Sequence, residues 1–190
     1  MATMMEVRFH GRGGQGAKTA ADLIATTALE TGKHIQSFPE YGPERAGAPI
    51  RSFTRISDSP IDLHCGVTNP EIVLVIDPSL LLTESVTEGL GDKGILLVNT
   101  TEKPDAIRKK IKFDKGKVFT VDATKIALDT IGRPLPNTPM LGALIKATNI
   151  VELDSLKNSV KNKFLKKIGE ANVNKNLDAI DKAFKETVEG

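Results

Sequence analysis

Residues 6–19 read EVRFHGRGGQGAKT, a strand-like run followed at once by a glycine-rich turn. The chain continues through QGAKTAADLIATTALETG, a long helix-forming stretch that begins at the end of this turn. A strand, a glycine turn and a helix in this order are typical of the first unit of a parallel α/β sheet. Backbone amides and the start of the helix then face any phosphate that approaches. The stretch therefore indicates the fold class and is also the first candidate binding site.

Further strand-like runs alternate with helical patterns along the chain. They read HIQSF, IVLVID, GILLVNT and KVFTVDA, and helix-competent stretches follow them. This alternation predicts an α/β fold in three layers, with a twisted, mostly parallel sheet and helices on both faces. Residues 50–56 and 61–65 flank the turn segment SDSP and predict one antiparallel hairpin inserted into the sheet.

Three helical segments follow the proline-rich stretch RPLPNTP. In the last two, apolar residues recur at spacings of three and four, which gives each helix one apolar face. These residues are Leu153, Leu156, Val160, Phe164, Val173, Leu177, Ile180, Phe184 and Val188. We expect the helices from about residue 151 to 190 to pack on the core, and residues 1–190 to form a single domain. The alternative for these apolar faces is a dedicated surface for a partner.

The composition limits the classes of function. The 190 residues include 26 basic and 24 acidic ones, and no segment concentrates positive charge as nucleic-acid-binding surfaces do. The single cysteine, Cys65, excludes an internal disulfide and cannot supply an iron–sulfur cluster or a structural zinc site. The N-terminus lacks a secretory signal, and no apolar run approaches the length of a membrane span. We expect a cytoplasmic protein that binds neither nucleic acid nor membrane.

The glycine turn matches two phosphate-binding motifs incompletely. Residues 11–16 follow the pattern G-x-G-x-x-G, but HIQSF does not end in the acidic residue that holds the ribose of a dinucleotide. The same glycines before Lys18 resemble a Walker A motif with Ala17 inserted, which would turn the lysine away from the phosphates. A third interpretation is structural, because glycines at such a turn also permit tight packing. What remains is an anion-binding turn that carries Arg12.

A second candidate is the segment of residues 37–49, SFPEYGPERAGAP, which has neither a strand nor a helix pattern. It follows the second strand, and the carboxyl ends of parallel strands usually carry function. Tyr41 and Arg45 offer a ring face and a guanidinium to an adenine or a phosphate. Glu40 and Glu44 are better explained as partners of neighbouring arginines that brace the loop.

No catalytic set can be assembled from the sequence. His10, His34 and His64 lack metal-ligand spacing and have no G-x-S-x-G serine nearby. Cys65 is adjacent to His64, but adjacent residues of a strand point to opposite faces. We expect neither a catalytic residue nor a metal site in this chain.

Three motifs together resemble a known family. HGRGGQGAKTAADLIA, FPEYGPERAGAPIRSFTRI and NPEIVLVID are similar, in this order, to the gamma subunit of the 2-oxoacid:ferredoxin oxidoreductases. The ERAGAP form resembles the pyruvate branch more than the 2-oxoglutarate branch. The resemblance covers residues 5–150, and the later NTPMLGAL is in keeping with it.

The resemblance implies a non-catalytic gamma subunit, inactive alone, of a pyruvate:ferredoxin oxidoreductase (pyruvate synthase). That complex interconverts pyruvate and CoA with acetyl-CoA and CO₂ and passes electrons to ferredoxin. The implied partners are alpha and beta chains with thiamine diphosphate and Mg²⁺, and a delta chain with iron–sulfur clusters. This chain is implied to bind none of these cofactors and to help shape the coenzyme A site. The residues that we expect to contact CoA are Gly11, Arg12, Gly13, Gly14, Gln15, Gly16, Lys18, Tyr41 and Arg45.

Three alternatives stay open. The chain could be the gamma subunit of a related 2-oxoglutarate or branched-chain 2-oxoacid oxidoreductase. It could be a stand-alone nucleotide-binding Rossmann-like protein, although the missing acidic residue after HIQSF argues against this. It could also be a pure assembly subunit, in which the glycines and residues 37–49 form an interface rather than a ligand site.

Overall fold

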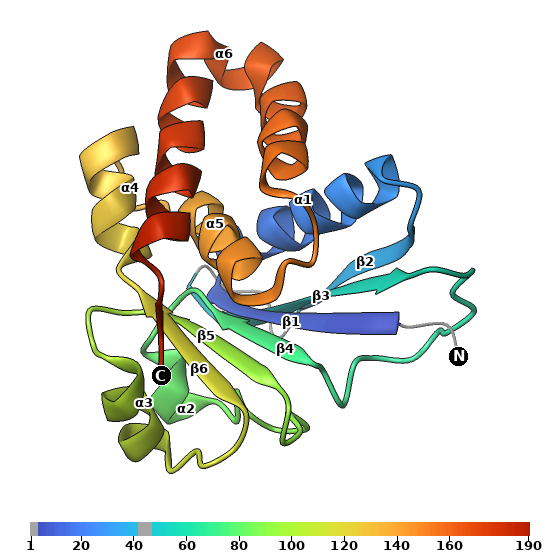
Figure 1. Cartoon of the computed structure of the whole chain (residues 1–190), viewed down its shortest axis with the longest axis vertical. Coiled ribbons are helices and arrows are strands. Elements are labelled where there is room, and N and C mark those ends of the chain that lie inside the picture. The colour runs from blue at the N-terminus through green and yellow to red at the C-terminus, as the bar shows by residue number, and fades with distance from the viewer. Residues whose placement is uncertain (1–3, 42–46) are drawn as a thin grey trace.

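The middle layer of the protein is a seven-stranded sheet (Figure 1). The computed structural model describes residues 4–41, of Tyr41 only the backbone, and residues 47–190. The strands are β1 (Met4–Arg12), β2 (His34–Tyr41), β3 (Pro49–Ser57), β4 (Ile72–Val75), β5 (Ile95–Asn99), β6 (Lys117–Val121) and β7 (Val188–Glu189). Their order is β2-β3-β1-β4-β5-β6-β7. Parallel pairing joins β1, β4, β5 and β6, whereas β3 and β7 pair antiparallel with their neighbours.

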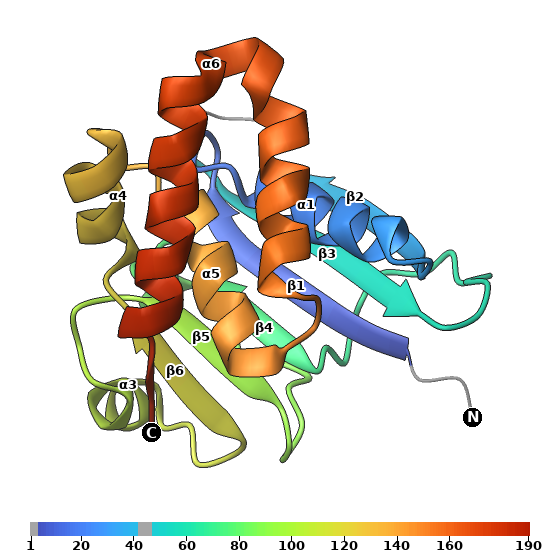
Figure 2. The same cartoon turned by 45° about the horizontal axis from the view of Figure 1, so that its top comes forward.

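Helices cover both faces of this sheet (Figure 2). On one face lie α1 (Ala17–Glu30), α4 (Ala123–Ile131), α5 (Asn137–Thr148) and α6 (Leu153–Glu186). On the other lie the shorter α2 (Leu80–Thr83) and α3 (Pro104–Ile111). Alternate residues of a strand point to opposite faces of the sheet. In β4, Leu74 packs against the helices of the first face, whereas Val73 and Val75 pack against those of the second. The predicted α/β fold with helices on both faces is confirmed.

The predicted antiparallel hairpin is wrong in its second strand. Residues 50–56 lie in β3, but residues 61–65 form no strand. β3 pairs instead with β1 on one side and with β2 on the other. The side-chain amide of Gln36 donates to the carbonyl oxygens of Ile61 and Leu63, at 3.3 and 2.9 Å. A side chain therefore satisfies carbonyls that a strand ladder would have used.

The loop predicted at residues 37–49 is shorter than expected. β2 continues through Pro39 to Tyr41, and β3 begins at Pro49. A proline is tolerated in β2 because this strand lies at the edge of the sheet, where one side of the backbone needs no partner. The expected bracing by Glu40 is confirmed for one pair, since its carboxylate lies 3.1 Å from the guanidinium of Arg51.

The C-terminal helices form a bent pair over the sheet. Gly169 interrupts α6 with φ 76° and ψ 163°, a backbone conformation almost confined to glycine. The two halves lie side by side and are joined by an ion pair of 2.7 Å between Lys157 and Asp181 (Figure 2). The residues of both apolar faces are buried or pack against the core, except Val188, which lies half exposed in β7.

One close approach holds α5 against α6. Gly142, in the middle of α5, lies so near to α6 that a Cβ atom there would overlap the carbonyl oxygen of Ile180. Only glycine fits at this crossing. No helix in the described part of the chain is both long and apolar enough to cross a membrane.

Candidate functional site

The glycine turn between β1 and α1 is fixed largely by its own hydrogen bonds. The amide of Gly13 donates to the carbonyl of Ala48 at 3.0 Å, and that of Gln15 donates to the carbonyl of Arg12 at 3.0 Å. Gly14 and Gly16 have φ angles of 94° and 79°, which ordinary side chains rarely adopt. The glycines therefore set the course of the chain into α1, and fewer turn amides are free for a ligand than the sequence suggests.

On one side of the turn, a group of four side chains bonds only within itself and to the backbone. Its members, Arg12, Gln15, Asp77 and Ser79, are called the Asp77 cluster below. Asp77 accepts hydrogen bonds from the Gln15 amide at 2.7 Å and from the Ser79 hydroxyl at 2.6 Å, and its carboxylate lies 3.2 Å from the Arg12 guanidinium. Arg12 also donates to the Ser79 hydroxyl at 2.9 Å and to the carbonyl of Gly47 at 3.1 Å. Its guanidinium is thus held by the protein itself.

The cluster keeps Asp77 charged. Burial by itself would raise the pKa of this carboxyl, whose side chain is 15% exposed, but hydrogen bonds from Ser79 and Gln15 and the charge of Arg12 outweigh burial and lower it. Sequence reasoning missed Asp77. The feature that could have identified this residue is its position at the end of NPEIVLVID, directly after a buried parallel strand.

The other predicted contact residues are scattered around the turn. Gly11 lies in β1, where a Cβ would come 3.2 Å from that of Ala17, so this glycine lets α1 begin close to β1. The ammonium of Lys18 is paired with Asp22 at 2.7 Å. Arg45 and the side chain of Tyr41 lie outside the described residues.

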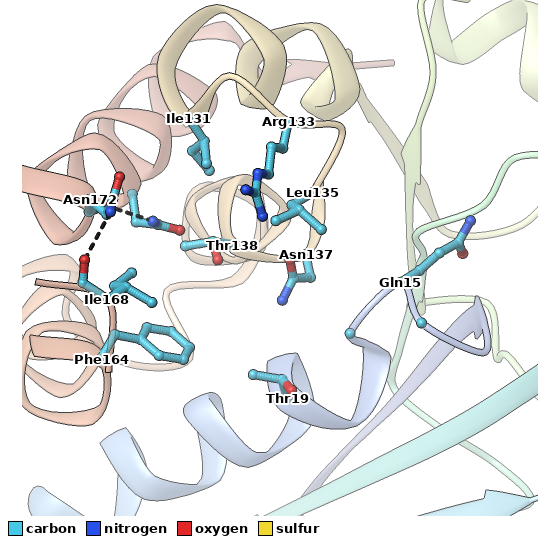
Figure 3. A pocket seen from close by; sticks show the side chains of 13 residues that line it. Gln15, Thr19, Ile131, Arg133, Leu135, Asn137, Thr138, Phe164, Ile168 and Asn172 are labelled. Atoms are coloured by element: carbon cyan, nitrogen blue, oxygen red, sulfur yellow. Dashed lines mark hydrogen bonds between the residues drawn. The ribbon is translucent and has the colours of Figure 1, made fainter. Parts of the chain in front are cut away.

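On the other side of the turn, a cavity of about 420 Å³ opens between α1, α5 and α6 (Figure 3). We call it the α1–α5 cavity. Its lining residues are Gly14, Gln15, Gly16, Thr19, Ile131, Arg133, Leu135, Asn137, Thr138, Phe164, Ile168, Asn172 and Asn176. It thus brings three of the predicted residues, Gly14 to Gly16, together with residues far away in the sequence.

Two helices begin at this cavity. Neither the first residue before α1, Gly16, nor the one before α5, Pro136, makes a side-chain capping hydrogen bond. The starts of helices carry amide groups without helical partners and a partial positive charge. In Gly16 a Cβ would lie 2.6 Å from the side-chain nitrogen of Asn137, so the two helix starts approach closely.

The remaining charge at the cavity is positive. Figure 3 shows the Arg133 side chain extending from the segment between α4 and α5 toward the cavity, whereas the end of the Gln15 side chain points away from it. The Gln15 amide donates to Asp77 instead. None of the described lining residues is acidic. Apolar side chains also line the cavity: Ile131 and Leu135 lie beside Arg133, and Phe164 lies on the α6 side (Figure 3).

Sequence reasoning missed the polar residues that α5 and the segment before it contribute. Arg133, Asn137 and Thr138 all belong to RPLPNTP, a proline-rich stretch whose last three residues also begin the family-like NTPMLGAL. The available signal was an arginine and an Asn-Thr pair around the start of a helix. Nothing in the local sequence indicated that this helix begins beside the glycine turn.

His10 is buried on the Asp77 side of β1, two residues before Arg12 and therefore on the same face of the strand. Burial first, and then the charges of Arg8 and Arg51, lower its pKa to about 3. Its Nε2 has no hydrogen-bond partner among the described residues. His64 and Cys65 are exposed in the segment without strand structure. In the described part of the chain, no group of three or more His, Cys, Asp or Glu side chains could hold a metal ion.

Comparisons with known proteins agree over almost the whole chain. The family profile described as Pyruvate ferredoxin/flavodoxin oxidoreductase matches residues 6–186. The "Pyruvate/ketoisovalerate oxidoreductases common subunit gamma" of Thermococcus kodakarensis is 48% identical, over 97% of this chain and 98% of its own length. "Pyruvate synthase subunit PorC" of Thermotoga maritima is also 48% identical, over 95% of this chain and 93% of its own length. A crystal structure of pyruvate oxidoreductase subunit PORC from Thermotoga maritima superposes with a TM-score of 0.89 at 44% identity, over 98% of each chain.

Proposed function

The chain belongs to the Pyruvate ferredoxin/flavodoxin oxidoreductase family, and we propose that within it this chain is the gamma subunit of a pyruvate:ferredoxin oxidoreductase. The observation that carries the proposal is the near-complete match to a PorC subunit of pyruvate synthase, in sequence and in fold. The chain spans almost the full length of these relatives, so their subunit role applies to it as a unit. The partners we propose are alpha, beta and delta chains that hold thiamine diphosphate, Mg²⁺ and iron–sulfur clusters.

We further propose that this chain helps to bind the CoA that the complex uses. The residues that support this role are Gly14 and Gly16, which place the start of α1 at the α1–α5 cavity. Amide groups at the start of a helix bind phosphate well, and CoA carries several phosphate groups. The contacts expected of Arg12, Lys18, Tyr41 and Arg45 remain predictions.

The subunit role is tested by purification from the native host. We expect a tagged chain to co-purify with partner subunits that reduce ferredoxin when pyruvate and CoA are both present, and the separated chain to reduce none. The assay should also use 2-oxoglutarate and 2-ketoisovalerate, because one relative is named as shared between pyruvate and ketoisovalerate enzymes. Activity of the isolated chain, or of the complex with 2-oxoglutarate instead of pyruvate, would contradict the proposal.

The CoA role is tested by Gly14→Asp in the reassembled complex. A carboxylate at the cavity should raise the KM for CoA by about tenfold or more, because it repels the phosphates, and leave the KM for pyruvate unchanged. Gly32→Asp is the matched control. Gly32 also has a positive φ, of 84°, and open space around its α-carbon, but it lies beyond the far end of α1. Equal effects of the two changes on the KM for CoA would rule out the proposed contact.

A further inference from the structure

The two edges of the sheet are protected differently. At one edge β7 pairs with β6, and Gly190 exchanges backbone hydrogen bonds with Val118. At the other edge lies β2, and no strand of the described chain pairs with its outer side. Residues 34–40 of β2 are all exposed at least in part. A bare strand edge is a template for a further strand, and proteins normally shield such edges.

The register of the sheet identifies which backbone groups of β2 are left over. The amide of Ile76, just after β4, donates to the carbonyl of His10, so even-numbered residues of β1 direct their backbone groups to β4 and odd-numbered ones to β3. The alternation continues through β3, where Ser52 bonds to β1 and Phe53 bonds to β2, opposite Phe38. The odd-numbered residues of β2 therefore direct their backbone groups outward.

Between residues 34 and 40, the outward groups are the amides and carbonyls of Ile35 and Ser37 and the carbonyl of Pro39. No hydrogen bond to these groups is found among the described residues. Pro39 has no amide hydrogen, but its nitrogen faces outward, so the pairing of β2 with β3 loses no bond. The edge therefore offers two donors and three acceptors in a row.

Exposed apolar side chains flank this row on both faces of the sheet. On the helix face, the Ser37 hydroxyl donates to Asp22 at 2.8 Å, so the Asp22 face of α1 lies toward β2. Leu29 lies two turns further along that face of α1 and is 56% exposed. On the other face, Phe38 and Leu63 line a cavity of about 370 Å³, and Leu63 is 41% exposed. A strand added to β2 would cover apolar surface as well as backbone.

The charges beside β2 give no preference for a strongly acidic or basic partner. Lys33 pairs with Asp58, and Arg51 pairs with Glu40. Like charges would therefore not keep two copies of this edge apart, and the row of donors and acceptors can pair with itself.

We propose that β2 pairs antiparallel with β2 of a second copy of this chain, about a two-fold axis at Ser37. In this register the two Ser37 residues exchange two hydrogen bonds, and each Ile35 amide donates to the Pro39 carbonyl of the other copy. Ile35 and Pro39 also meet as an apolar pair on the α1 face. On the opposite face, the exposed His34 lies across from Glu40 of the other copy and can donate a hydrogen bond to its carboxylate.

The test is the mass of the full chain in solution, measured by sedimentation equilibrium over a range of concentrations. We expect a reversible monomer–dimer equilibrium. The amides of Ile35 and Ser37 should exchange hydrogen slowly in the dimer and quickly after dilution. A chain that stays monomeric would overturn the proposal. A dimer in which these amides exchange quickly would also overturn it, because another surface would then join the copies.

Ser37→Pro isolates the backbone bonds of the pairing. It removes the two central donors, and Pro39 shows that an outward position of β2 accepts proline. The dissociation constant of the dimer should rise by about tenfold or more. Ser37→Ala is the matched control, because it keeps the amide and loses only the hydroxyl bond to Asp22. Equal weakening of the dimer by both changes would overturn the proposal.

Two changes at His34 test the register. His34→Glu places two carboxylates opposite each other and should weaken the dimer by about fivefold, whereas His34→Lys should strengthen it by about threefold. His34 is exposed, so thermal unfolding of the monomer should change little in either variant. Effects of the same sign, or no effect of either change, would overturn the proposed pairing.

This inference goes beyond the subunit role, and the two fail separately. A dimer that depends on the Ser37 amide would stand even if the chain did not co-purify with a pyruvate-oxidising complex. Conversely, an active complex in which the β2 amides are protected, while the isolated chain stays monomeric, would retain the subunit role. It would overturn self-pairing and assign the edge to a different chain.

Discussion

The Asp77 cluster and the α1–α5 cavity lie on the two sides of the glycine turn and differ in how many of their charged groups are paired. On the Asp77 side, every member of the cluster bonds to another member or to the backbone, and the charges of Arg12 and Asp77 compensate each other. On the cavity side, two helix starts and Arg133 lie at the α1–α5 cavity, and none of its described lining residues is acidic. The comparison teaches that a phosphate-binding sequence pattern does not identify the side on which a ligand binds. We assign stability to the first side and binding to the second.

The strongest test of this assignment is Asp77→Ala. It leaves Arg12 without its carboxylate and removes the acceptor of Gln15 and Ser79, so the free energy of unfolding should fall by about 3 kcal/mol. Chemical denaturation measures this loss, with Asp114→Ala as the control at an exposed site. The affinity of the folded variant for CoA should change less than twofold. Lost affinity with intact stability would reverse the assignment.

The second test is the pH dependence that His10 creates on the Asp77 side. An unfolded histidine has a pKa of about 6.5, whereas burial and the charges of Arg8 and Arg51 lower that of His10 to about 3. The unfolded state therefore binds more protons below pH 6.5, and stability is lost as the pH falls. Between pH 6.5 and 5, where few carboxyl groups titrate, we expect a total loss of about 1.6 kcal/mol, with a slope that approaches about 1.4 kcal/mol per pH unit only toward pH 5. In His10→Gln the free energy of unfolding should vary less over this interval; an unchanged slope would show that His10 is not its cause.

A third test separates backbone strain from the contact between the helix starts. Gly16→Ala strains a positive φ and brings a Cβ to 2.6 Å from the Asn137 side chain, so it should cost about 2 kcal/mol of stability. Gly14→Ala strains a positive φ in the same way, but its Cβ would have no neighbour within 4 Å, so this change should lower the free energy of unfolding by about 1 kcal/mol. Thermal unfolding of both variants measures the difference. Equal costs would mean that Asn137 moves aside freely and that the two helix starts are not held together.

The smallest effect is expected at Lys18. Its ion pair with Asp22 joins two partly exposed side chains one helical turn apart, so Lys18→Gln should change the free energy of unfolding by less than about 0.5 kcal/mol. Because the Lys18 ammonium is paired with Asp22, the affinity for CoA should change less than twofold. A tenfold loss of affinity in calorimetry would restore Lys18 as a phosphate contact and extend the binding side around α1.

The parts that the sequence predicted are those determined locally. The unit of β1, glycine turn and α1 follows from neighbouring residues, and so do the apolar faces of α6, because spacing alone determines which residues share a helix face. The predictions that were wrong depend on contacts between residues that are far apart in the sequence. Residues 61–65 have strand propensity, but the side chain of Gln36 binds their carbonyls.

The same limit applies to the site. Asp77 lies 62 residues from Gln15, and its role appears only when β1 and β4 become neighbours. Arg133 and Thr138 become candidates only because α5 begins beside the turn. The spacing of residues in the sequence does not indicate that two helices begin next to each other. The cavity could therefore not be predicted, although the glycine turn at its edge could.

Gly142 has a consequence for protein engineering. Replacing helix glycines with alanine is a common route to heat resistance, because alanine favours the helix by about 1 kcal/mol and restricts the unfolded chain. In the middle of α5 this rule would fail, since the added carbon would overlap the carbonyl oxygen of Ile180 and force α6 away from its neighbour. A thermostabilisation programme for this chain should therefore leave position 142 untouched and seek its gains on the exposed surface of α6.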